Sequence, residues 1–167
     1  MIYFSSLLQT NPTYKPAADN LFAALHLAGV AYRLLDNTRD IWLRDFMPVQ
    51  RRDGKYVSFR YEPSYLKDVP ELRTNFKKDI SDSFPAEQIL YSDINLDGGN
   101  VVFTPSKRKA VISDRIFSEN ANKNRADLVS ELSAVLDAEI MIIESLPSDM
   151  TGHADGMVRF VTEDTVL

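Results

Sequence analysis

The chain has 167 residues, of which 44% are hydrophobic and 26% charged, and its formal net charge is −5. This composition is typical of one soluble globular domain with a core of its own. The sequence contains no cysteine, which excludes disulfides, thiolate metal sites and nucleophilic catalysis by a cysteine of this chain.

The charge pattern and the apolar runs indicate where the protein acts and what it binds. The mild acidity gives no basic face for nucleic acid, and no apolar run reaches the roughly 20 residues that a membrane span needs. We therefore expect a cytoplasmic protein that binds neither nucleic acid nor membrane. A cationic small molecule suits its charge better.

The first half of the chain predicts two strands around a helix, then a hairpin and a second helix. Pro16 suits the first turn of the first helix, and Gly29 can end that helix in a left-handed conformation. The Asp53-Gly54 dipeptide is typical of a hairpin turn. The predicted elements are a strand (2–5), a helix (16–28), a buried strand (30–35), a polar loop with Trp42-Leu-Arg-Asp45, two hairpin strands (46–50 and 55–61) and a helix (71–84) ended by Pro85.

The second half predicts the same order of elements again. Leu128, Leu132 and Leu136 fall on one face of a helix, and the alternation of strands and helices indicates an α/β class. The predicted elements are strands at 88–91, 101–104 and 110–113, a helix at 125–136, a strand at 139–143, a loop at 147–155 and a strand at 157–161.

An acidic residue marks the same place in each repeat. Asp45 and Asp97 are 52 residues apart (97 − 45), and Asp97 and Asp155 are 58 apart (155 − 97). Each unit reads strand, loop with an acid, strand, tight turn, strand, helix. Units of this kind stack around an axis and bring equivalent loops to one end. The pattern therefore predicts a propeller-like array in which three acidic loops face one another.

The two ends of the chain carry only parts of a unit. The N-terminus supplies the last strand and helix of one unit, and the C-terminus supplies the beginning of another. We expect residues 1–167 to form a single, truncated propeller domain, roughly half of a ring. A second chain or a missing C-terminal part would then complete it.

Three short motifs resemble a known family. Trp42-Leu-Arg-Asp45, Asp97-Gly-Gly-Asn100 and Gly152-His-Ala-Asp-Gly156 with Arg159-Phe160 are similar, in order and spacing, to motifs of the agmatine deiminase and bacterial (Porphyromonas-type) peptidylarginine deiminase family. The resemblance runs across nearly the whole chain. It implies the pentein fold, a five-unit α/β propeller whose active site lies on the axis.

The resemblance also implies an activity and a role for each site residue. Enzymes of this family hydrolyse a guanidinium group to a ureido group and ammonia through a cysteine-linked intermediate. Asp45 and Asp155 would hold the guanidinium, because its planar N–H donors match bidentate carboxylates. His153 would act as general acid and base, Asp97 would orient it, and Trp42 would line the substrate site.

The chain departs from the family pattern at the nucleophile, because it has no cysteine. Thr151 adjoins the third motif, but an unactivated hydroxyl is a poor nucleophile. We therefore predict that the chain alone does not turn guanidines over and binds them weakly at best. The residues leave agmatine, peptidylarginine and free arginine open as substrates. We favour agmatine or a related small guanidine, and we expect no metal and no cofactor.

Two other functions and several structural roles are open from the residues themselves. Three converging acids could bind cationic ligands without catalysis, and His153 with Asp155 and one further carboxylate could hold a metal ion. The Asp97–Asn100 segment could be a turn whose glycines need positive φ. Trp42 could be a core anchor, and Arg44 is expected to neutralise Asp40 or Asp45.

Overall fold

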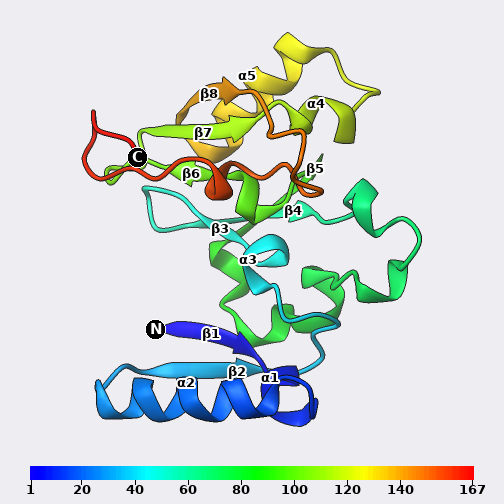
Figure 1. Cartoon of the computed structure of the whole chain (residues 1–167). Coiled ribbons are helices and arrows are strands. Elements are labelled where there is room, and N and C mark those ends of the chain that lie inside the picture. Colours follow the sequence, from blue (N-terminus) through cyan, green and yellow to red (C-terminus); the bar gives the residue numbers. More distant parts are fainter.

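The computed structural model describes residues 1–167, apart from the side chain of Ala86. The fold is mixed α/β, as predicted, and its strands form three small sheets (Figure 1). The strands are β1 (Ile2–Ser5), β2 (Tyr32–Leu35), β3 (Val49–Gln50), β4 (Tyr56–Arg60), β5 (Ile89–Asn95), β6 (Val102–Phe103), β7 (Lys109–Ser113) and β8 (Glu139–Ile143). The α-helices are α1 (Leu7–Thr10), α2 (Lys15–Leu27), α3 (Leu43–Phe46), α4 (Arg115–Glu119) and α5 (Arg125–Leu136).

The two three-stranded sheets have the same topology. In β3-β4-β5 and in β6-β7-β8, the middle strand pairs antiparallel with the strand before it and parallel with the strand after it. The third sheet is the parallel pair β1-β2. A parallel pair needs a crossover, and α2 and α5 lie in two of the three crossovers. The repeat of strand order is present, and its arrangement around an axis stays a prediction.

Two of the acid-bearing segments join one sheet to the next, and the third follows the last sheet. Asp45 lies between β2 and β3, Asp97 lies between β5 and β6, and Asp155 follows β8. In each case the chain has just left the last, parallel strand of a sheet. Each repeat unit of the sequence, which begins with a strand and an acid-bearing loop, is therefore divided between two sheets for the units that contain Asp45 and Asp97.

Helix α5 has the bounds that the sequence predicts, because local signals and packing agree there. The side chain of Asn124 accepts hydrogen bonds from the backbone N–H of Ala126 at 2.8 Å and of Asp127 at 3.4 Å, which satisfies two free donors of the first turn. Leu128, Leu132 and Leu136 are fully buried on one face. These leucines belong to a core beneath β5–β8, while a second core gathers around β2, α3 and β4.

The helix predicted at residues 71–84 is wrong. The segment forms short 3-10 turns at Pro70–Leu72 and Ser81–Ser83 and one π turn at Phe76–Ile80. Asn75 adopts an extended conformation, and its side chain accepts a hydrogen bond from the N–H of Lys78. Asn75 therefore caps a new turn at a position that a continuous helix over 71–84 would need in a helical conformation.

Three smaller predictions need correction. Residues 157–161 form no strand, and within the described residues this part pairs only through the bridge between Phe160 and Val166. The predicted strand at 30–35 is shorter, and only Leu35 in it is buried. The loop around Asp45 contains the helical turn α3, because the N–H of Met47 bonds to the carbonyl of Leu43. No helix in the described residues has the length and apolar character of a membrane span.

Candidate functional site

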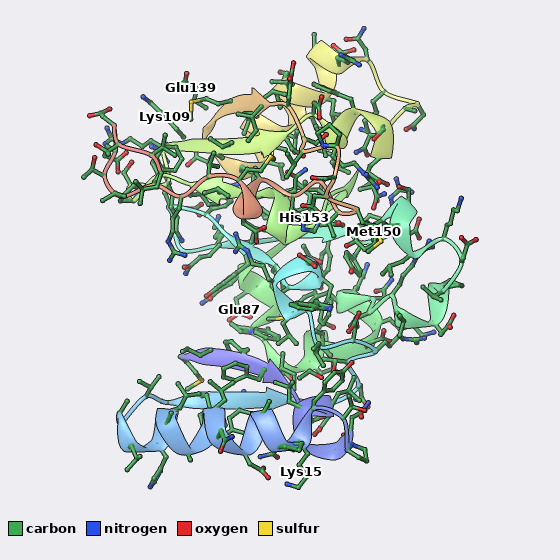
Figure 2. The ribbon with its side chains drawn as sticks, in the orientation of Figure 1. Lys15, Glu87, Lys109, Glu139, Met150 and His153 are labelled. Carbon is green, nitrogen blue, oxygen red and sulfur yellow. The ribbon has the colours of Figure 1, made fainter. Side chains whose placement is uncertain are left out.

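Three of the predicted site residues, Asp45, Asp97 and Asp155, lie close to a fourth, His153. Figure 2 shows this histidine toward the middle of the molecule, near α3. Its ring lies between the carboxylates of Asp97 and Asp45, and Asp155 follows two residues later in the chain. The convergence predicted for the three acidic segments is therefore present in the contacts. Their roles in binding or catalysis stay predictions.

Asp97 holds one side of the imidazole. The His153 Nε2 atom is 2.7 Å from Asp97 Oδ2, a short hydrogen bond between two buried groups. The hydroxyl of Tyr65 donates to the same oxygen at 3.0 Å. Tyr65 was not found by sequence reasoning, because no motif distinguishes it and it reaches Asp97 only in the folded chain.

Asp45 faces the other ring nitrogen at a longer distance. Its Oδ1 atom is 3.5 Å from His153 Nδ1, and its side chain is 16% exposed. Burial raises the pKa of the Asp45 carboxyl to about 6, the positive charge of His153 opposes the rise, and the negative charges of Asp97 and Asp155 add to it. The carboxylate is thus poorly solvated, and a cation placed beside it would stabilise its charged form.

The surrounding acids favour the charged form of His153. Burial disfavours the imidazolium, but the hydrogen bond to Asp97 and the negative charges of Asp45, Asp97 and Asp155 outweigh it and raise the pKa of His153 above its usual value. The site therefore holds a histidine whose protonated form is favoured by its neighbours, beside a carboxyl whose protonated form is favoured by burial.

The two glycines between Asp97 and Asn100 are required by close contacts. The segment is a 3-10 turn at Gly98–Asn100, as its turn interpretation required, but neither glycine has a positive φ, so that part of the interpretation is wrong. A Cβ on Gly98 would collide with the backbone carbonyl of Arg44. A Cβ on Gly99 would lie 2.6 Å from both Asp45 Oδ1 and His153 Nδ1, and 3.2 Å from Asp155 Oδ2. Gly99 therefore lies directly against the atoms of the candidate site.

Asp155 and Arg44 form the outer part of the cluster. The side chain of Asp155 is 43% exposed, and its Oδ2 atom is 4.0 Å from Arg44 Nε. Arg44 also donates to the carbonyl of Val101 at 2.6 Å. The expectation that Arg44 neutralises Asp40 or Asp45 is wrong, since it links the first acid-bearing segment to the second and third.

Trp42 precedes α3 and is 63% exposed. The interpretation as a core anchor is therefore wrong. Its role in lining a substrate site stays a prediction.

The metal alternative finds no support in the geometry. In the part of the chain that the structure describes, no three His, Asp or Glu side chains are grouped so as to hold a metal ion. His153 Nε2 and Asp97 Oδ2 are hydrogen-bonded to each other, which fits an oriented acid–base group.

One of the comparisons with known proteins identifies a family, and another finds solved structures with the same fold. The family model of the Porphyromonas-type peptidyl-arginine deiminases matches residues 7–167. No curated protein matches the chain. Among solved structures, agmatine deiminase from C. jejuni is similar with a TM-score of 0.71 and 17% identity over 99% of this chain and 60% of that one.

Two further solved structures share the fold. A cysteine-to-serine variant of the C. jejuni enzyme with substrate bound has a TM-score of 0.68 and 16% identity, again over 99% of this chain and 60% of that one. A cysteine-to-serine variant of DDAH from Pseudomonas aeruginosa, complexed with citrulline, has a TM-score of 0.57 and 12% identity over 92% of this chain and 58% of that one. The chain thus spans about 60% of the length of these structures.

Proposed function

Because the chain belongs to the Porphyromonas-type peptidyl-arginine deiminase family, we propose that it carries the guanidinium-binding and acid–base residues of a guanidine hydrolase. The observation that carries this proposal is that Asp45, Asp155 and His153 meet beside Gly99 while Asp97 holds the other side of the His153 ring. Three carboxylates and one imidazole in that arrangement suit a planar cation that must also exchange protons.

Asp45 and Asp155 are the proposed guanidinium ligands. Gly99 presents no side chain to Asp45 Oδ1 and Asp155 Oδ2, so a flat group can approach both acceptors. A guanidinium offers N–H donors in one plane, and carboxylates accept them in pairs. Burial raises the pKa of Asp45 to about 6. A bound cation would favour the charged carboxylate and so lower that pKa.

His153 is the proposed general acid and base. Its Nδ1 atom faces Asp45, and therefore the bound guanidinium, while Nε2 is held by Asp97. The raised pKa of His153 favours the protonated ring, which can give its proton to the departing ammonia. The neutral imidazole can then take a proton from the attacking water.

The chain does not supply the nucleophile of the cysteine-linked route. It contains no cysteine, so a cysteine from outside the 167 residues is part of the proposal, and the chain alone binds without turnover. Agmatine or a related small guanidine is the proposed ligand. Residues 1–167 are proposed to form a single domain.

The test is a calorimetric titration of the 167-residue chain with agmatine, with an assay of ammonia in the same samples. We expect weak binding, no ammonia above background, and loss of binding in Asp45→Asn. Asp19→Asn is the matched control, because Asp19 is an exposed helix residue paired only with Lys15. Equal binding by Asp45→Asn and Asp19→Asn would contradict the assignment, and ammonia release well above background would contradict the predicted inactivity.

A cation binder without catalysis remains the second candidate, because the same carboxylates and the missing cysteine favour it equally. Binding that survives His153→Ala unchanged, with no turnover after a cysteine-containing partner is added, would favour this candidate over the hydrolase.

A further inference from the structure

Two polar side chains outside the acid cluster hold the backbone on both sides of His153. Asn100 is 3% exposed, and its Oδ1 atom accepts a hydrogen bond from the N–H of Ala154 at 3.2 Å. Ser113 is fully buried, and its hydroxyl donates to the carbonyl of Gly152 at 2.6 Å. The peptide groups that precede and follow His153 are therefore both fixed by side chains.

The two side chains are also joined to each other. The Oδ1 atom of Asn100 accepts a second hydrogen bond from the backbone N–H of Ser113 at 2.8 Å. Both partners of Asn100 are N–H donors, so an acceptor is required at this position. A carboxylate would accept as well, but it would place another buried negative charge near Asp45 and Asp97.

The backbone at this point needs such support. Gly152 has a φ of +62° and His153 is extended, so the chain changes direction immediately before the histidine. The stretch from β8 to His153 contains no regular element in the described structure. With the peptide groups on both sides fixed, the Cα–Cβ bond of His153 can point in one direction only, and Asp97 then sets the ring.

One short segment thus controls both the backbone and the ring of the histidine. Asp97 and Asn100 belong to the same turn around Gly98–Asn100, and one contacts the imidazole while the other contacts the following peptide. We propose that Asn100 and Ser113 are positioning residues that aim His153 between Asp45 and Asp97. The inference rests on the proposed acid–base role of His153, although the contacts themselves do not depend on it.

The experiment follows the titration of the His153 ring by NMR in the ligand-free chain. The groups that face this ring are Asp97, Asp45, Asp155 and Tyr65, and Asp149 also lies close enough to act on its charge. The chain has two histidines, so His26 in α2 serves as an internal reference. We expect Asn100→Ala and Ser113→Ala to lower the pKa of His153 toward the usual value of a histidine, with His26 unchanged.

Asn120→Ala is the matched control. Asn120 is 1% exposed and bonds to the backbone of Asn95 and Ile116, so its loss costs stability without touching the His153 segment. Ser113→Thr keeps a hydroxyl and should keep the raised pKa. An unchanged His153 pKa in folded Asn100→Ala and Ser113→Ala, or an equal fall in Asn120→Ala, overturns the proposal.

A second measurement needs no variant. Hydrogen exchange in the unaltered chain should show a protected N–H at Ala154, because Asn100 accepts it inside the fold. An Ala154 N–H that exchanges as fast as an open loop overturns the proposal even if the variants do not fold. Neither measurement involves a guanidine. A failure of the proposed function can therefore be distinguished from a failure of the proposed positioning role of Asn100 and Ser113.

Discussion

Asp45 and Asp97 occupy equivalent places in two repeat units, yet the fold treats them differently. Asp97 Oδ2 accepts two hydrogen bonds, from His153 Nε2 at 2.7 Å and from the Tyr65 hydroxyl at 3.0 Å. Asp45 lies 3.5 Å from His153 Nδ1, and burial raises the pKa of its carboxyl to about 6. The repeat sets the positions of the two acids in the chain, and their neighbours in the fold set their hydrogen bonds and the pKa of Asp45. Asp97 is bound to two side chains of the protein, whereas the contact of Asp45 with His153 is longer, which is why Asp45 rather than Asp97 is the proposed cation ligand.

The largest expected effect separates the two acids by ligand binding. If the comparison is right, Asp45→Asn weakens agmatine binding about 100-fold, the loss typical of removing one partner of a buried charge pair. Asp97→Asn should weaken it only several-fold. For the pKa of His153, measured by NMR, the order reverses, because Asp97 makes the hydrogen bond and Asp45 acts only by its charge. If one substitution had the larger effect on both agmatine binding and the pKa of His153, the proposed difference between Asp45 and Asp97 would be contradicted.

The contact between the two acid-bearing segments gives the next effect. Gly98→Ala would force a Cβ against the backbone carbonyl of Arg44, and we expect it to lower the free energy of unfolding by about 2–3 kcal/mol, as overpacking does. Gly156→Ala is the control, since a Cβ there would meet only Asp149 Oδ2, at 3.9 Å. Urea denaturation of both variants measures the difference, and equal stabilities would show that the segments can separate freely.

Ionisation of Asp45 should make the protein less stable as the pH rises. Its pKa is 3.8 in an ordinary carboxyl and about 6 in the fold, so the stability it contributes is fully present below pH 3.8 and is lost as the pH rises through 6. Relative to Asp45→Asn, the native chain should lose about 1–3 kcal/mol between roughly pH 4 and pH 7. Denaturant midpoints across this range test it, and a parallel course of the two curves would contradict the raised pKa.

The smallest expected effect concerns the Tyr65 hydroxyl, which donates a hydrogen bond to Asp97. Tyr65→Phe removes one donor and keeps the ring edge near His153, so we expect a loss of about 0.5–1.5 kcal/mol in the free energy of unfolding. Tyr14→Phe, at the beginning of α2 and outside the site, is the control and should cost little. An equal effect of both substitutions would mean that Asp97 does not depend on Tyr65.

Sequence reasoning predicted the elements in which local signals and packing agree. Helix α5 and strand β8 have the predicted bounds, because the Asn124 cap, the leucine spacing and the apolar run at 139–143 all favour the same structure. It was wrong at 71–84, where a moderately amphipathic pattern predicted a helix and the local bond of Asn75 favours separate turns. It was also wrong at 157–161, because a strand needs an edge to pair with, and that depends on the rest of the fold.

The candidate site shows the same division. Asp45, Asp97, His153 and Asp155 could be found because they stand in motifs and recur at a regular spacing. Tyr65 and Ser113 stand in no motif. Their hydrogen bonds cross 32 and 39 positions of the chain, to Asp97 and Gly152. Such contacts have no signal in a single sequence.

The sequence by itself determined the α/β class, the repeat of strand order, the family and the identity of His153 and the three acids that gather near it. These depend on periodicity and on local motifs, which a chain carries before it folds. Only the tertiary structure decided that Asp97 Oδ2 accepts hydrogen bonds from both His153 and Tyr65, and that Asn100 and Ser113 hold the peptides beside His153. A carboxylate's pKa and a side chain's direction depend on burial and on neighbours from distant parts of the chain, and those are settled only when the sheets pack together.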